Sequence, residues 1–150
     1  MRDGSRNVRD HSQSRGFSLI ELMIVLIIFG ALIGFGIPSF HKYSQTQRVR
    51  GTSENLVQTI QLQRSRAMAT GQSVTLNFNT GTPPGWTSIS EGRSSHHPLP
   101  NGVTYASAAP NQLILSRDGR VNTSGTIVFT NRTGWTDTVS VQISGFALIR

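Results

Sequence analysis

A long apolar run near the N-terminus is the feature that most constrains how this chain can fold. From Phe17 to Phe40 the only polar side chains are those of Ser18, Glu21 and Ser39. At about 1.5 Å of rise per residue, these 24 residues form a helix of roughly 36 Å, which is enough to cross a hydrocarbon core of about 30 Å. A chain of 150 residues has no core that could surround such a helix on every side. We therefore expect a transmembrane helix rather than a buried core helix.

A cleaved secretory signal peptide is the main alternative for this run. Residues 1–15 carry four arginines, as the charged start of a signal peptide would. The apolar stretch of a signal peptide is about 7–15 residues long, however, and it ends at a small-residue A-x-A cleavage site. Here the run is longer, no A-x-A follows it, and the sequence after Phe40 continues in a helical pattern. We therefore expect the apolar segment to stay in the mature protein.

The junction between the basic leader and the apolar run carries a specific motif, RGFSLIELM, at residues 15–23. This motif resembles the processing site of type IV pilins and type II secretion pseudopilins. The resemblance implies that prepilin peptidase cuts between Gly16 and Phe17 and then methylates the new N-terminal amine of Phe17. It also implies that Glu21, the fifth residue of the mature chain, has a role in assembly.

Physical chemistry explains why Glu21 would need a partner. An acidic side chain at the middle of a membrane costs about 2.5–3.5 kcal/mol on insertion scales, and less near an interface. Cleavage creates one cation nearby, the amine of Phe17, which lies one helical turn from Glu21. In the filaments of the pilin and pseudopilin family that this motif resembles, the glutamate faces the N-terminal amine of a neighbouring subunit and sets the axial register. A purely structural acid that reaches the membrane interface is the alternative.

Three glycines and a proline mark the softest part of the apolar helix. Gly30 and Gly34 have the spacing of small residues that allows helices to approach closely in a membrane. Each glycine costs about 1 kcal/mol relative to alanine in a helix interior, and Pro38 removes one backbone donor. Gly36 adds to the same effect. The sequence allows two outcomes for this segment. It can unwind in the filament, as it does in related pilins, or it can simply kink at Pro38.

Beyond the apolar run the helical pattern continues and then changes to the alternation of strands. An apolar stripe in three- and four-residue steps predicts a helix face that packs on a sheet; it consists of Val49, Ser53, Leu56, Ile60, Gln63 and Ala67. Thr70-Gly71 predicts the helix end. Strands are expected at residues 74–79, 86–90, 103–106, 112–117, 126–130 and 138–144, with a last strand or a continuation at 146–149. Residues 91–101 are expected to form a loop, and 118–119 and 131–134 to form turns.

These patterns predict an α+β fold with a long N-terminal helix packed on a small antiparallel β-sheet head, and the resemblance implies that this fold is of the type IV pilin-like class. Residues 56–78, LVQTIQLQRSRAMATGQSVTLNF, resemble the helix-to-first-strand block of the H-type minor pseudopilins. The expected parts are a cleaved basic leader (1–16), a transmembrane and assembly helix (17–40), an amphipathic continuation of that helix (41–71) and a β-rich globular head (72–150).

Enzymatic chemistry has little support in the sequence. There is no cysteine, no phosphate-binding glycine loop and no nucleophile–base pattern. His96 and His97 are adjacent in a loop rich in serine and proline, where neighbouring side chains usually point apart, and the sequence suggests no third ligand. Asp118 is explained by its turn. We therefore expect no enzyme activity, no cofactor and no metal.

The arginines point to one competing function, the binding of DNA. The formal net charge is +7. Some minor pilins of the resembling family bind DNA for natural transformation through a C-terminal Gly-Arg-x-Arg. In the matching residues 145–150 only the glycine aligns, because Phe146 stands in place of the first arginine. The residues that would contact DNA if this function held are Arg117, Arg120 and Arg150.

We therefore predict a minor pseudopilin that is processed by prepilin peptidase and assembled into the pseudopilus of a type II protein secretion system. Its partners would be the peptidase, other pilins or pseudopilins and the assembly platform in the inner membrane. It would span the bacterial inner membrane once, with a cytoplasmic N-terminus and a periplasmic head. The alternative is a type IV pilus minor pilin that binds DNA for natural transformation, with DNA as a less expected partner.

Overall fold

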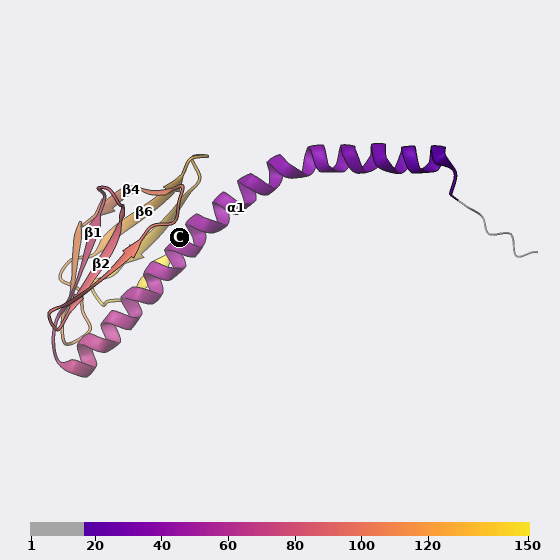
Figure 1. The fold of residues 1–150 in the computed structure, drawn as a ribbon. Coiled ribbons are helices and arrows are strands. Elements are labelled where there is room, and N and C mark those ends of the chain that lie inside the picture. The colour runs from indigo at the N-terminus through magenta and orange to yellow at the C-terminus, as the bar shows by residue number, and fades with distance from the viewer. Residues whose placement is uncertain (1–16) are drawn as a thin grey trace, which may run out of the picture. The chain divides into compact units, whose positions relative to one another are not determined.

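The computed structural model describes residues 17–150, without the side chains of residues 35–39 and 41 (Figure 1). The predicted leader, and with it Gly16 of the predicted cleavage site, lies outside the described residues. The chain divides into two compact units that meet in the sequence at Pro38 and Ser39. The buried apolar core lies wholly in the second unit, between Val49 and Ala147.

One helix, α1 (Leu19–Thr70), contains both the apolar run and the predicted amphipathic continuation. The predicted stripe is confirmed, because each of its six side chains is at most 4% exposed: Val49, Ser53, Leu56, Ile60, Gln63 and Ala67. The helix ends at Thr70 because Gly71 adopts a φ of +68°, the left-handed conformation that favours glycine just past a helix end.

The first unit presents the apolar part of α1. Its large apolar side chains from Phe17 to Ile33 are between 38% and 81% exposed. No helix among the described residues is long and apolar enough to cross a membrane.

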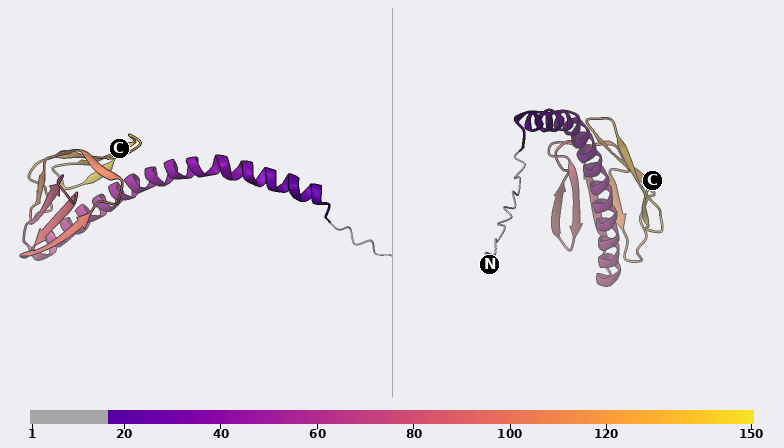
Figure 2. Two further views of the ribbon diagram at one scale, coloured as in Figure 1. Left: turned by 45° about the horizontal axis from the view of Figure 1, so that its top comes forward. Right: turned by 90° about the vertical axis from the view of Figure 1, so that its right-hand side faces the viewer.

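Eight strands form two four-stranded antiparallel sheets in the second unit, and both pack against the C-terminal half of α1 (Figure 2). The first sheet has the order β3-β2-β1-β5 and the second the order β4-β6-β7-β8. The strands of the first sheet are β1 (Val74–Asn79), β2 (Gly85–Ser90), β3 (Arg93–Pro98) and β5 (Gln112–Leu115). Those of the second are β4 (Val103–Ala109), β6 (Gly125–Asn131), β7 (Thr136–Val141) and β8 (Ala147–Ile149).

The core forms where the helix stripe meets the inward-facing residues of both sheets. Leu56 and Ile60 of α1 are fully buried, as are Leu76 of β1 and Phe129 of β6. These strand residues face inward because alternate residues of a strand point to the same side, and the burial patterns of β1 and β6 alternate in this way. Trp86 adds a large buried ring, whose centroid lies 6.4 Å from that of Phe129.

The prediction of a loop at residues 91–101 was wrong, because β3 occupies most of this segment. β2 and β3 form a hairpin in which Ser90 pairs with Arg93, so its turn is only Glu91 and Gly92. Both turn residues have a positive φ, 53° and 74°, as a two-residue hairpin turn of type I′ requires. β3 has no apolar alternation and is mostly exposed. Backbone hydrogen bonds to β2 hold β3 in place. Because this pairing does not depend on the side chains, the sequence of β3 shows no alternation of apolar and polar residues.

The turn predicted at residues 118–119 is present. After the turn, however, only one residue, Val121, forms a β-bridge with the strand before it. The N–H of Gly119 donates to the carbonyl of Ser116 at 2.8 Å, and Leu115 pairs with Val121 as an isolated bridge. The N–H of Val121 then donates to the carbonyl of Ile143 at 2.9 Å. β5 therefore ends at Leu115 rather than at Arg117, because the chain turns to bridge toward the β7–β8 connection.

Tyr105 of β4 has a buried hydroxyl oxygen without a hydrogen-bond partner among the described residues. Its ring packs between Phe129, with centroids 5.2 Å apart, and Phe78, at 6.4 Å. Burial disfavours the charged phenolate, so it raises the pKa of Tyr105 above its ordinary value.

We predict that Tyr105→Phe leaves the protein as stable as before at neutral pH, or more stable by up to about 1 kcal/mol, because it removes an unpaired buried hydroxyl. The folded-state pKa lies above the unfolded value of 10.0, so the original protein loses stability as the pH rises above that value. The variant lacks this loss. Denaturant unfolding at several pH values measures both effects. Tyr43→Phe is the control, because Tyr43 is 62% exposed, and it should keep the alkaline loss.

Candidate functional site

The residues predicted to act in assembly lie at the first turn of α1. The helix begins at Leu19, and the N–H of Leu22 donates to the carbonyl of Ser18 at 3.2 Å. Ser18 therefore takes the N-cap position and Glu21 the third helical position, which is the spacing of a capping box. A carboxylate at this position lies in the positive field of the helix N-terminus, which stabilises its charge.

Glu21 is exposed and forms no ion pair within the described part of the chain, where the only such pair joins Arg50 and Glu54 at 3.3 Å. Phe17, four residues before Glu21, is 81% exposed. A carboxylate in an apolar stretch, without a cation in its own described chain, can pair with a cation that cleavage or a neighbouring subunit supplies. Gly16, the other half of the predicted cleavage site, lies outside the described residues.

The predicted soft segment is helical in this structure. α1 continues without a break through Gly30, Gly34, Gly36 and Pro38. A Cβ atom added at Gly30 or Gly34 would meet nothing within 4 Å, so this part of the helix surface is open to a close neighbour. The boundary between the two compact units falls at Pro38. Unwinding in an assembled filament stays a prediction.

The structure does not gather the three arginines proposed as DNA contacts. Arg117 and Arg120 are exposed beside the turn that follows β5. Arg150 lies past the end of β8, where its N–H donates to the carbonyl of Thr138 at 2.9 Å. The turn at Gly119 instead approaches Gly145, which precedes β8. Arg150 is therefore at the opposite end of β8 from the other two.

Arg64 has a structural role that the sequence did not reveal. Its Nε donates to the carbonyl of Gly119 at 2.9 Å, and its guanidinium carbon lies 4.5 Å from the ring centroid of Phe146. One side chain of α1 thus contacts two turns that are far apart in the sequence, the turn at Gly119 and the turn before Phe146. Gly145 has a φ of +79°, and an added Cβ there would collide with the Gly119 carbonyl, so a glycine is required where the turns meet.

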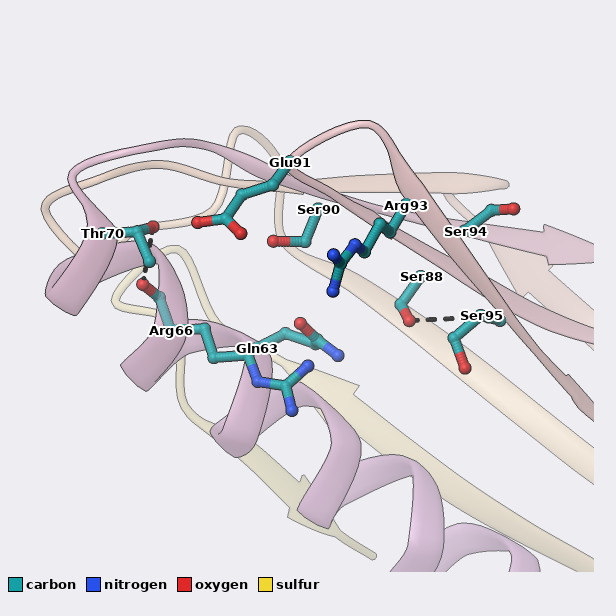
Figure 3. A pocket seen from close by; sticks show the side chains of 9 residues that line it. All are labelled: Gln63, Arg66, Thr70, Ser88, Ser90, Glu91, Arg93, Ser94 and Ser95. Carbon is teal, nitrogen blue, oxygen red and sulfur yellow. Dashed lines mark hydrogen bonds between the residues drawn. The ribbon is translucent and has the colours of Figure 1, made fainter.

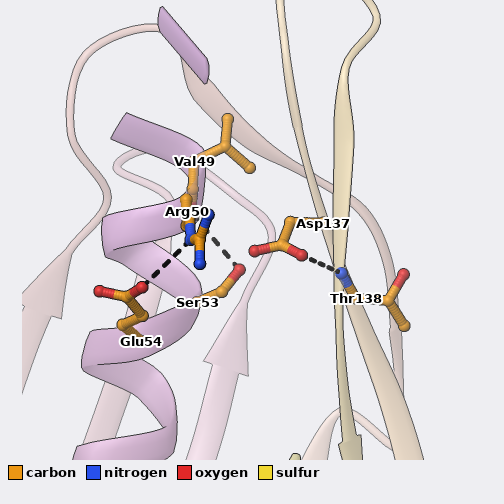
Figure 4. A network of polar contacts seen from close by, with 6 residues as sticks. All are labelled: Val49, Arg50, Ser53, Glu54, Asp137 and Thr138. Carbon is orange, nitrogen blue, oxygen red and sulfur yellow. Dashed lines mark hydrogen bonds and ion pairs between the residues drawn. The ribbon is translucent and has the colours of Figure 1, made fainter. Parts of the chain in front are cut away.

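A buried carboxylate, Asp137, also escaped the sequence analysis. It lies on β7, is 7% exposed and points toward α1 near Ser53 (Figure 4). Its Oδ1 accepts a hydrogen bond from the N–H of Thr138 at 3.1 Å, whereas its Oδ2 has no partner among the described residues. The alternation of β7 places Asp137 on the same face as Val139 and Val141. Extending that alternation by one step would have identified it.

The adjacent histidines of β3 have different partners. The Nδ1 of His96 lies 3.1 Å from the hydroxyl of Thr87, and the ring of His97 stacks on Trp86 with centroids 5.7 Å apart. Among the described residues, no group of three His, Cys, Asp or Glu side chains is arranged to hold a metal ion.

Two family models match the sequence. The prokaryotic N-terminal methylation motif matches residues 11–37, and the type II transport protein GspH matches residues 52–145. No match is found among curated protein sequences.

Two solved structures have a similar fold. The type IV minor pilin FimU of Pseudomonas aeruginosa aligns with a TM-score of 0.57 at 15% identity, over 72% of this chain and 92% of its own. The minor pseudopilin EpsH of the Vibrio cholerae type 2 secretion system aligns with a TM-score of 0.54 at 15% identity, over 69% of this chain and 96% of its own. The predicted pilin-like α+β fold is confirmed.

We predict that Arg64→Ala lowers the free energy of unfolding by about 2 kcal/mol. It removes a charged hydrogen bond, worth about 1.5–3 kcal/mol, and a cation–π contact, worth about 0.5–1 kcal/mol, at a site that is partly exposed to solvent. Arg66→Ala is the matched control, because Arg66 is exposed on the same helix, and it should change stability by less than about 0.5 kcal/mol. Equal losses in the two variants, measured by denaturant unfolding, would contradict the role given to Arg64.

Proposed function

We propose that this chain, which belongs to the type II transport protein GspH family, is a minor pseudopilin of a type II secretion system. The observation that carries the proposal is the order of the two family matches along one helix. The methylation motif at residues 11–37 covers the start of α1, and the GspH match at 52–145 covers most of its buried part and strands β1 to β7. Members of this family are structural subunits, not enzymes.

Processing would prepare the N-terminus for assembly. In the proposed mechanism, prepilin peptidase cuts between Gly16 and Phe17 and methylates the amine of Phe17. Residues 17–40 then anchor the chain in the inner membrane, with the N-terminus on the cytoplasmic side and the head in the periplasm. The support for the anchor is the sequence, in which this segment has only three polar side chains, together with the exposure of its apolar side chains from Phe17 to Ile33.

Assembly would join these exposed residues to those of neighbouring subunits. Gly30 and Gly34 leave the helix surface open to close approach. The Glu21 carboxylate would pair with the N-terminal amine of a neighbour and so fix the axial position of one helix against the next. Other pseudopilins and the assembly platform are the partners that this mechanism requires.

A type IV pilus minor pilin is the second candidate, and the fold shared with the minor pilin FimU favours it. DNA binding has less support in the head. Arg64 is committed to Gly119 and Phe146, and Arg150 lies apart from Arg117 and Arg120. The identity of the neighbouring genes, for secretion components or for pilus components, distinguishes the two filaments.

We predict that mass spectrometry of the protein from its native membrane finds a chain that begins at methylated Phe17. Gly16→Ala should still be cut, whereas Gly16→Leu should accumulate as the uncut precursor, because a small side chain is what the cleavage site accepts. A chain that begins after Ser39, or one that retains Met1, would contradict the proposed processing.

We predict that Glu21→Val still inserts into the membrane, because it removes an insertion cost, but incorporates poorly into the filament. Pull-down of assembled filaments at native expression measures incorporation. Glu54→Val is the control, because it also removes an exposed acid of α1, but from the second unit. Normal incorporation of Glu21→Val would argue against its pairing with a neighbouring amine.

A further inference from the structure

A polar pocket of about 500 Å³ lies between the last turns of α1 and the β2–β3 hairpin (Figure 3). Both walls belong to the second compact unit. The helix supplies Gln63, Arg66 and Thr70. The hairpin supplies six residues: Ser88, Ser90, Glu91, Arg93, Ser94 and Ser95. The pocket has no part in the proposed function.

Two arginine side chains from different elements reach into the pocket. Arg66 comes from α1 and Arg93 from β3, and both line the pocket; Figure 3 shows the Arg93 side chain directed toward the helix and the Arg66 guanidinium beside the Gln63 side chain. Neither forms an ion pair, because the one ion pair among residues 17–150 with described side chains joins Arg50 and Glu54. Guanidinium groups donate in a planar fork that matches a carboxylate, so this pair is suited to an anionic group.

The charge of the pocket matches a single carboxylate. Its titratable side chains are two arginines and Glu91, which leaves one net positive charge. One carboxylate would neutralise it. A stretch of nucleic acid brings several negative charges, and those beyond the first would meet the Glu91 carboxylate without a positive charge to offset them.

The side chain of Gln63 favours a ligand that carries a hydrogen-bond donor, which a simple anion such as acetate lacks. Its side chain is only 4% exposed, and its Oε1 is buried without a donor among the described residues. A buried acceptor without a partner is unfavourable by about 1–3 kcal/mol, so a ligand that supplies an N–H donor gains if the Gln63 amide turns its Oε1 toward the pocket. The backbone of a polypeptide supplies such an N–H next to an acidic side chain.

We propose that this pocket binds an aspartate or glutamate side chain of a partner polypeptide. Arg66 and Arg93 hold the carboxylate, and Gln63 accepts a hydrogen bond from the adjacent backbone N–H. The proposal rests on the proposed function in one respect, namely that a filament brings a neighbouring polypeptide next to the head.

The test is a titration of the full chain in non-ionic detergent, at about 150 mM salt, followed by NMR of the backbone amides of β2 and β3. The probe is an N-acetylated, C-amidated Gly-Glu-Gly tripeptide. We expect saturable shifts at the pocket with a dissociation constant of roughly 1 mM, and no saturable shifts with the matched Gly-Gln-Gly peptide. Sodium acetate should bind more weakly than the acidic peptide, because it carries no N–H.

Variants separate the pocket from general electrostatics. Arg66→Gln and Arg93→Gln should each weaken binding of the acidic peptide at least about fivefold, as the loss of a charged hydrogen bond predicts. Arg132→Gln makes the same charge change on an exposed arginine in the turn between β6 and β7, and it should leave the affinity unchanged. Gln63→Met should weaken the peptide but not acetate. Denaturant unfolding shows whether each variant remains folded under the conditions of the titration.

Three results would overturn the proposal. The first is equal weakening by Arg132→Gln, and the second is equal binding of the two peptides. The third is tighter binding of inorganic phosphate or of duplex DNA at the same salt, which would assign the pocket to phosphate groups instead. Because the probes need no filament, their failure would leave the proposed function standing. Failed processing or incorporation would likewise leave the binding result intact.

Discussion

The packing of one face of α1 against two sheets is the contact on which the rest of the structure depends. Within the described residues the two sheets share no strand, so no continuous ladder of hydrogen bonds joins them. Leu56 and Ile60 of the helix enter the same core as Leu76 of one sheet and Phe129 of the other. Small sheets with one apolar face are marginal by themselves and need a partner for that face. The helix is that partner for both sheets, and this explains why its second half is amphipathic while its first half is not.

The same helix therefore meets two different environments along its length. In the second unit its apolar side chains are buried by strands of the same chain, as at Val49 and Ala67. From Phe17 to Ile33 its large apolar side chains have no such cover in the single chain. Burying one Leu, Ile or Phe side chain fully is worth about 1.5–3 kcal/mol, so covering this exposed stretch would be strongly favourable. The two compact units divide between these two stretches, at Pro38.

The sequence predicts those elements of the structure whose apolar residues recur at a regular spacing. The stripe from Val49 to Ala67 repeats in three- and four-residue steps, and β1 alternates, so both were placed correctly. β3 was missed because backbone pairing holds it and its side chains bury little. The contact of Arg64 with Gly119 joins residues 55 apart, and the pocket arginines come from different elements. Such pairs are set by the packing of the helix on the sheets, which no local pattern records.

Phe146 shows how one such long-range contact constrains the C-terminus. In the Gly-Arg-x-Arg tail with which the sequence analysis compared residues 145–150, an arginine stands at the position of Phe146. Here the ring of Phe146 lies under the guanidinium of Arg64, which also holds the Gly119 carbonyl. A second guanidinium at position 146 would place two like charges in contact and remove the aromatic surface that Arg64 covers. The residues at 64 and 146 are therefore coupled. In this chain Arg64 joins the turn before β8 to α1, through its contact with Phe146 and its hydrogen bond to the Gly119 carbonyl.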